Sequence, residues 1–195
     1  NAYTNSEYPE RVTQITVKHL LNHTGGWGRD SDSISTDPSN MTKYKNLDAA
    51  QLIKVCIDSI PLINQPGTFF QYSNVGYIIL GKVIEKASGM QYESYVKENI
   101  FEKCLIKKAV IASQAQTSKE WNEATYYSSL SNSSYSANRI RRKASGGWVM
   151  SAIDLQRFLV RVDGNSKYKD VFDSTTRNEM LRPELINPNY ALGWR

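Results

Sequence analysis

Two polar side chains, Tyr72 and Asn74, are the strongest candidates for chemistry in this sequence. They follow a Gln-Pro-Gly turn at residues 65–67 and precede an apolar, helix-like run that begins at Val75. A loop that enters a helix at this point can present a phenol, which carries a proton, beside a carboxamide, which donates a hydrogen bond to a substrate. Because a Tyr-x-Asn tripeptide is common by chance, its meaning depends on the surrounding sequence.

Three ordered blocks of sequence resemble the serine beta-lactamase-like family, which includes class C beta-lactamases, D-alanyl-D-alanine carboxypeptidases and related esterases. The blocks lie at residues 15–27 (ITVKHLLNHTGGW), 66–77 (PGTFFQYSNVGY) and 146–155 (GGWVMSAIDL). The resemblance runs in order from about Arg11 to Arg195, which is nearly the whole chain. It implies a serine hydrolase that forms an acyl-enzyme on an amide or ester, either a beta-lactam, a D-alanyl peptide or a carboxylic ester.

The resemblance also implies roles for the two candidate residues. In such enzymes the nucleophile is the serine of a Ser-x-x-Lys motif at a helix start, and a Lys- or His-x-Gly strand forms a third motif. Tyr72 would help to take the serine proton and return it to the leaving group, and Asn74 would donate to the substrate carbonyl. The other two motifs would lie upstream and downstream of residues 1–195. The chain is therefore expected to be a single domain, an internal fragment of a catalytic domain that is inactive alone.

Two Ser-x-x-Lys matches occur inside the chain, and they begin at Ser94 and Ser166. Ser94 falls in an amphipathic helical pattern, where a solvated helix residue is the simpler interpretation. Ser166 follows a turn-like stretch at residues 163–165, and its order relative to Tyr72 is the reverse of the family's. We expect neither serine to be the nucleophile.

An alternative from another class stays open, in which the chain is a non-catalytic homologue that serves as a binding or scaffold protein. Gly26 and Trp27 depart from the Ser-Gly-Leu ending that is frequent in the family, and this departure is compatible with both hypotheses. The presence of both Tyr72 and Asn74 favours an enzyme. A longer parent chain without an upstream Ser-x-x-Lys motif would favour the alternative.

Composition and charge narrow the class of partner. The 195 residues are 40% hydrophobic and 11% aromatic, which is enough for one sizeable core, and no run of about twenty apolar residues exists. The chain has 24 Lys and Arg residues against 19 Asp and Glu. The densest cluster of basic residues, at 139–143, is best explained as a solvated loop edge. We expect a small-molecule or peptide substrate, no nucleic-acid partner, and self-association through apolar surface that the rest of the parent domain would cover. The compartment is unknown, and only the family resemblance favours a secreted or extracytoplasmic location.

No cofactor is expected. His19 and His23 are four residues apart, which is a metal-compatible spacing, but Leu20 stands where a zincin motif needs Glu and no third ligand is suggested. His23 is expected to bond to local backbone. The two cysteines, Cys56 and Cys104, permit one disulfide, although a buried free thiol is the default for each.

Capping residues and hydrophobic periodicity predict a mainly α structure. A short helix should follow Thr16 and run through Leu21 to a stop at Gly25-Gly26. Further helices are predicted at 48–59, 74–87, 92–101, 151–162 and 173–181, and short strands at 147–150 and 190–194. Residues 114–143 are predicted to be a long excursion or weak strands. The resemblance identifies this arrangement as the helical region of a beta-lactamase/transpeptidase-like α+β fold, with short edge strands.

Overall fold

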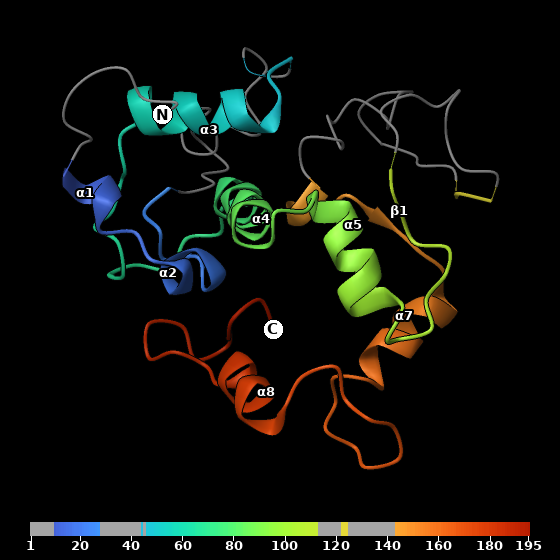
Figure 1. The fold of residues 1–195 in the computed structure, drawn as a ribbon. Helices are drawn as coiled ribbons and strands as arrows, with labels where there is room; N and C mark the ends of the chain where they lie inside the picture. The colour runs from blue at the N-terminus through green and yellow to red at the C-terminus, as the bar shows by residue number, and fades with distance from the viewer. Residues whose placement is uncertain (1–9, 28–43, 45, 113–121, 125–142) are drawn as a thin grey trace.

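The computed structural model describes residues 10–27, 44, 46–112, 122–124 and 143–195 (Figure 1). The helices in these residues are α1 (Glu10–Thr13), α2 (Val17–Leu21), α3 (Ala49–Ser59), α4 (Asn74–Ser88), α5 (Tyr92–Val96), the π-helix η3 (Lys97–Phe101), the 3-10 helix η5 (Lys143–Ser145), α7 (Ala152–Leu159) and α8 (Ser174–Leu181). Strand β1 (Val110–Ile111) pairs in antiparallel fashion with β2 (Trp148–Val149). This composition agrees with the predicted mainly α class, and the strand predicted at 147–150 is confirmed.

Local capping sets the starts of the predicted helices. In five of these helices the N-cap side chain accepts a hydrogen bond from the backbone N–H three positions later, and the capping residues are Thr16, Asp48, Ser73, Ser151 and Asp173. The N-cap of α5, Gln91, makes no such bond. Helix α4 ends within one residue of its predicted end at 87, because Gly89 takes a left-handed conformation with a φ of 71°. These contacts span only a few residues, which explains why the sequence alone predicts them.

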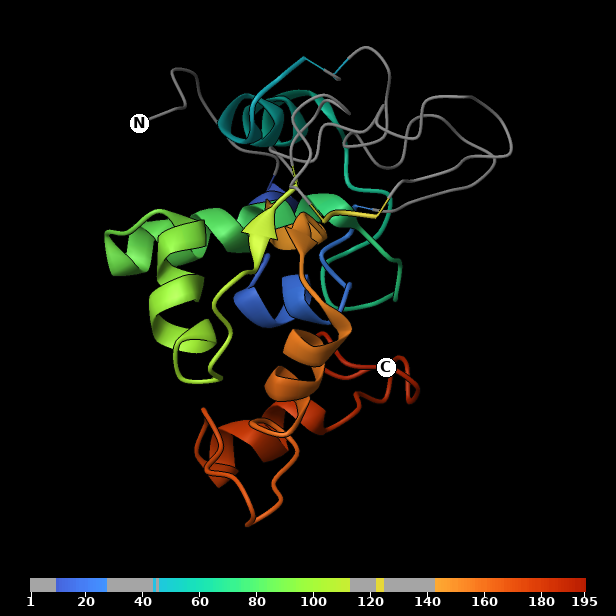
Figure 2. The same ribbon diagram turned by 90° about the vertical axis from the view of Figure 1, so that its right-hand side faces the viewer.

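Helix α4 is the centre of the molecule. It lies between α3 and α2 in both views, and it also contacts α5 and η5 (Figures 1 and 2). The residues at its start are buried on several sides, and the main core cluster around them contains Trp27, Leu52, Cys56, Leu62, Val75 and Ile78. Dense packing of this kind leaves the first turn of α4 little freedom to move.

A second core cluster packs where η3 and the following turn meet β2. Its fully buried members are Phe101, Cys104, Ile106 and Ala109. The ring of Trp148 lies edge-on to Phe101 with centroids 4.7 Å apart, and its indole N–H donates to the Tyr92 hydroxyl at 3.2 Å. Cys104 lies here while Cys56 lies in the first cluster, and both cysteines are free thiols.

The glycine pair Gly25-Gly26, at the end of the first block, allows a turn that other residues could not make. Gly26 has a φ of 96°, and a Cβ on it would stand 2.6 Å from the carbonyl oxygen of Asn64. An alanine would therefore need both a strained backbone and a shift of neighbouring main chain. Beside it Trp27 is buried, and its indole N–H donates to the Ile60 carbonyl at 3.3 Å.

The strand predicted at 190–194 is wrong. The Ala191 amide donates to the carbonyl of Trp194 at 2.8 Å, and the Leu192 amide donates to the carbonyl of Met180, at the end of α8, at 3.1 Å. Gly193 has a φ of 87°, which reverses the chain. The backbone groups that a strand would offer to a neighbour are used by a turn and by a helix end, so this segment is irregular.

Three other predictions need correction. Helix α2 stops before the glycine pair, because His23 takes the left-handed conformation with a φ of 58°. Helix α7 ends at Leu159, and the residues up to Val162 continue as tight turns. The sequence from Ser151 to Asp154 has the form of a capping box, in which the Asp154 carboxylate would accept from the Ser151 backbone amide. In the structure this carboxylate accepts instead from the Ser151 hydroxyl at 3.0 Å. Most of the excursion predicted at 114–143, including the basic cluster up to residue 142, lies outside the described residues.

Candidate active site

Tyr72 and Asn74 lie at the point where the loop after residues 65–67 enters α4. Ser73 between them caps the helix, so the two candidate residues flank the cap. Tyr72 is 41% exposed, whereas Asn74 is only 6% exposed. The Tyr72 hydroxyl donates to Asn74 Oδ1 at 3.4 Å, at the long end of the hydrogen-bond range. The structure therefore brings the two predicted site residues together, one accessible and one fixed.

Three hydrogen bonds attach this loop to the segment that follows α2. The Gly67 amide donates to the Thr24 carbonyl at 2.8 Å, and the Gln71 amide donates to the His23 carbonyl at 2.8 Å. The Ser73 amide donates to Nδ1 of the His23 ring at 3.1 Å. Because the last two bonds lie on either side of Tyr72, they fix the backbone that carries its phenol.

The ring of His23 is neutral, and its tautomer follows from its neighbours. Burial lowers the pKa of His23 to about 4, so the ring is uncharged near neutral pH. Nδ1 accepts the Ser73 amide proton, so the ring proton sits on Nε2 and is donated to the Tyr190 hydroxyl oxygen, 2.9 Å away. His23 thus links the start of α4 to the C-terminal segment of the chain.

Three tyrosine rings surround the His23 ring. Their centroids lie 4.5 Å away for Tyr72 and 5.0 Å away for both Tyr77 and Tyr190. The Tyr77 hydroxyl donates to the Leu21 carbonyl at 2.8 Å. Burial, as the largest cause, raises the pKa of Tyr77 and of Tyr190 above the usual value for a phenol, which keeps both protonated. Of the three tyrosines, Tyr72 is exposed, and Tyr77 and Tyr190 are half-buried.

Comparison with known proteins assigns the chain to a family. A profile of the Beta-lactamase family matches residues 3–195. The chain belongs to the Beta-lactamase family. This family is part of the serine hydrolase superfamily, so the predicted resemblance is confirmed.

The curated proteins similar to this Beta-lactamase family member include a penicillin-binding protein, and the solved structures that share its fold include an amidohydrolase. Penicillin-binding protein 4* of Bacillus subtilis is 33% identical over 88 residues, which cover 45% of this chain and 19% of that protein. Among solved structures, the D-stereospecific amidohydrolase from Streptomyces sp. aligns with a TM-score of 0.73 at 24% identity, over 95% of this chain and 59% of that one. The penicillin binding protein from Bacillus halodurans aligns with a TM-score of 0.66 at 23% identity, over 93% and 57%. These structures show a shared fold, and the chain spans less than half the length of the curated relatives it matches.

The first internal Ser-x-x-Lys match lies on α5 and η3, away from the start of α4 in sequence. Ser94 is exposed, and the Lys97 ammonium forms an ion pair with Glu93 at 2.8 Å. A lysine that activates a serine must face that serine. This pairing supports the prediction that Ser94 is an ordinary helix residue.

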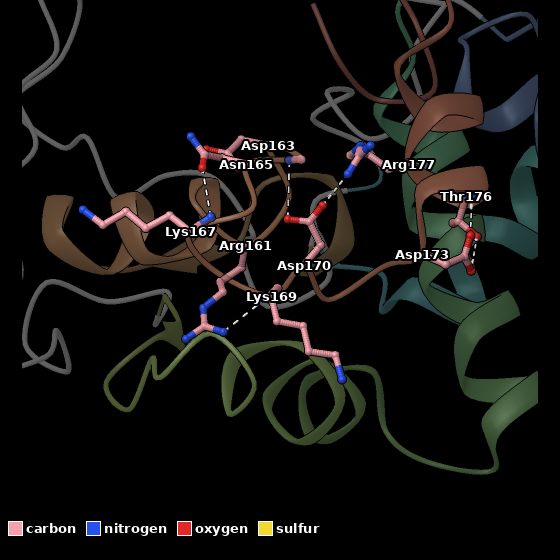
Figure 3. Close-up of polar contacts among 10 residues, drawn as sticks. Arg161, Asp163, Asn165, Lys167, Lys169, Asp170, Asp173, Thr176 and Arg177 are labelled. Carbon is pink, nitrogen blue, oxygen red and sulfur yellow. Dashed lines mark hydrogen bonds and ion pairs between the residues drawn. The ribbon is translucent and has the colours of Figure 1, made fainter.

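The second match lies in the loop between α7 and α8, where Ser166 and Lys169 are both exposed. Figure 3 shows that local contacts shape this loop, because Asn165 Oδ1 accepts the Lys167 amide at 3.0 Å and the Arg161 guanidinium donates to the Lys169 carbonyl at 3.2 Å. None of the contacts drawn there reaches the Lys169 ammonium. The arrangement supports the prediction that Ser166 is not the nucleophile.

The histidine pair does not form a metal site. The two ring nitrogens of His23 already have partners, and His19 Nδ1 accepts the Thr16 amide at 3.3 Å. Over the described part of the chain, no group of three His, Cys, Asp or Glu side chains could hold a metal ion. In the same residues, no helix is both long and apolar enough to cross a membrane.

Sequence reasoning missed Tyr190 and gave His23 the wrong partner. His23 was expected to bond to local backbone, but the backbone amide it accepts belongs to Ser73, fifty positions along the chain. Tyr190 was considered only as part of a strand. A histidine at a helix end, with unmet donor and acceptor needs, is the signal that could have prompted a search for distant partners.

Proposed function

We propose that residues 1–195 are an internal segment of the catalytic domain of a serine hydrolase, which forms an acyl-enzyme on an amide or ester. The observation that carries this proposal is the exposed Tyr72 phenol, held beside the Asn74 carboxamide at the buried start of α4. The serine nucleophile and its lysine are assigned to the parent chain outside residues 1–195. The segment alone is then inactive.

The proposed reaction has two steps. In the first step the serine oxygen bonds to the substrate carbonyl carbon. The serine proton passes to the Tyr72 oxygen while the Tyr72 hydroxyl proton passes to the neutral amine of the parent chain's lysine, and the C–N or C–O bond breaks. The leaving amine or alcohol departs with the proton that the serine lost. In the second step a water molecule adds to the acyl carbon and releases the carboxylic acid, while the serine oxygen regains a proton.

Asn74 suits the proposed role of hydrogen-bond donor to the substrate carbonyl, because an amide can accept with its oxygen while it donates with its nitrogen. Its oxygen faces the Tyr72 hydroxyl, so one carboxamide can orient the proton carrier and bind the substrate carbonyl. Burial of Asn74 in the first turn of α4 supports this role, because a preorganised donor needs no reordering when the substrate arrives. The amidohydrolase and penicillin-binding relatives support an amide or beta-lactam as substrate.

The test is the intact mass of the longer parent protein after exposure to a fluorophosphonate, with residues 1–195 as control. The expected result is one covalent adduct on the parent and none on the segment. An adduct on the segment would instead implicate Ser94 or Ser166. A parent protein without any adduct would favour the alternative, a non-catalytic binding or scaffold protein.

We also infer that the isolated segment self-associates. Three large apolar side chains of α7 are exposed, namely Ile153, Leu155 and Leu159. Beyond α8, Leu185 is fully exposed. Clustered exposed apolar surface of this kind usually marks a contact with another part of a protein. Light scattering over a concentration series is expected to show a rising average mass, and a constant monomer mass would contradict the inference.

A further inference from the structure

We propose that Tyr190, acting through His23, is a positioning residue for Tyr72 and Asn74. This inference rests on the proposed hydrolase function, because it concerns how the same site is held in place. The C-terminal segment would then be part of the active site's support.

A continuous set of hydrogen bonds carries the argument. The Tyr190 hydroxyl lies 2.9 Å from Nε2 of His23, and Nδ1 of the same ring lies 3.1 Å from the Ser73 amide. Ser73 is the residue between the two proposed catalytic side chains and is also the N-cap of α4. Since the His23 ring is only 3% exposed, water cannot replace either partner without opening the structure.

The Tyr190 end of this connection is itself anchored. Lys18 on α2 forms an ion pair with Glu184 at 2.6 Å, which ties the start of the C-terminal segment to the helix that precedes His23. Further along, the Leu192 amide donates to the Met180 carbonyl at 3.1 Å. In Figures 1 and 2 this segment runs from α8 back beneath α2. Tyr190 is therefore held between two fixed points, so that its hydroxyl can restrict the rotation of the His23 ring.

A substitution at His23 can separate its hydrogen bond to Ser73 from its hydrogen bond to Tyr190. Its φ of 58° lies in the left-handed region, which asparagine tolerates better than most residues. In His23→Asn the side-chain oxygen stands three bonds from Cα, as Nδ1 does, so it can still accept from Ser73. The same side chain is too short to reach Tyr190. His23→Ala removes both contacts.

The experiment compares Tyr190→Phe with Tyr77→Phe in the longer parent protein. Each change removes one hydroxyl beside the His23 ring, but the Tyr77 hydroxyl bonds to the Leu21 carbonyl and to the Tyr190 hydroxyl, and not to the ring itself. Fluorophosphonate labelling gives a maximal rate and a half-saturating probe concentration, and hydrogen exchange reports on the Ser73 amide. Tyr190→Phe is expected to lower the maximal labelling rate about tenfold with little change in half-saturation, because a small misplacement of catalytic groups is costly.

The same variant should speed exchange of the Ser73 amide about tenfold, because the ring that accepts its proton is no longer held. Tyr77→Phe should change both readouts much less than Tyr190→Phe does, because the Tyr77 hydroxyl contacts the Tyr190 hydroxyl and not the His23 ring. His23→Asn should retain more Ser73 protection and more labelling than His23→Ala, because its side-chain oxygen can still accept the Ser73 amide proton.

The outcomes separate this inference from the proposed function. If the wild-type parent protein is never labelled, the proposed function is wrong, and the positioning role that rests on it is wrong too. A wild-type parent that labels, together with a Tyr190→Phe variant that labels at the same rate, overturns the positioning role alone. Equal losses in Tyr190→Phe and Tyr77→Phe also overturn it, because the cause would then be general loosening of the aromatic cluster.

Discussion

Two regions of this molecule carry residue pairs of the kind that hydrolases use, and they are built in opposite ways. The Tyr72–Asn74 segment is held by His23, which lies far upstream, and through it by Tyr190, which lies far downstream. The loop that carries Ser166 and Lys169 is held by contacts among residues 161–177 (Figure 3). The first region has a buried, neutral ring at its base, and the second has exposed side chains on a turn.

The comparison shows what separates a functional spacing from a coincidental one. Both motifs satisfy a simple sequence pattern with two fixed residues. Only the first pair is placed where long-range contacts fix its geometry while one member stays accessible. Preorganisation of this kind is what catalysis requires, and local turn contacts do not supply it.

The largest expected difference between the regions is in catalysis. Tyr72→Phe in the longer parent protein should lower the rate of fluorophosphonate labelling by about 10²–10⁴-fold, because it removes the proposed proton carrier. Ser166→Ala should leave that rate unchanged. Intact-mass time courses measure both. A loss of labelling in Ser166→Ala, with Tyr72→Phe unaffected, would reverse the assignment of the two regions.

The next difference is in stability. His23→Ala should lower the free energy of unfolding by about 3 kcal/mol, because it empties a buried site and leaves the Ser73 amide without its acceptor. Lys169→Ala, on the exposed loop, should change it by less than about 0.5 kcal/mol. Urea denaturation of the protein and both variants measures these values. Similar losses for the two variants would mean that the long-range contacts of His23 add little.

The pH dependence of stability should also distinguish the regions. The pKa of His23 is about 4 in the folded protein and about 6.5 in an unfolded chain. Its contribution to stability is therefore complete above pH 6.5 and is lost as the pH falls toward 4, because only the unfolded state gains the proton. The total loss is about 3 kcal/mol.

Chemical denaturation of the wild type and His23→Asn between pH 7 and 4.5 tests this expectation. The difference in unfolding free energy between the two proteins should shrink steadily as the pH falls below about 6.5. A difference that stays constant across this range would show that His23 gains its proton as readily in the folded protein as in the unfolded chain.

The smallest expected effect concerns the loop's ion pair. Arg177 binds Asp170 at 2.6 Å, so Asp170→Asn should cost about 1 kcal/mol. That cost should decline in high salt because the pair is partly exposed. The cost of His23→Ala should not change with salt, since it arises from uncharged contacts. Denaturation at low and high ionic strength measures the cost of both substitutions. If the cost of Asp170→Asn did not change with salt, the ion pair would be shielded from solvent more than the exposure of its two side chains indicates.

Features that depend on a few neighbouring residues could be predicted from the sequence. The N-caps at Thr16, Asp48 and Ser73 place the starts of three helices, because each cap bonds three residues ahead. Tyr72 and Asn74 were predicted as a pair for the same reason, since the helix start between them sets their separation. The strand predicted at 190–194 failed, because a strand needs a partner that its own sequence does not contain.

The sequence by itself determined the helical segments, their capped ends, the family and the pair of polar residues at the start of α4, because these follow from contacts or patterns along the chain. Only the tertiary structure decided which groups support that pair. His23 could have bonded anywhere, and it is the packing of α2 against α4 and of the C-terminal segment beneath α2 that brings Ser73 and Tyr190 to its two nitrogens. A buried ring must satisfy both nitrogens at once, and only the folded chain supplies partners from two distant segments.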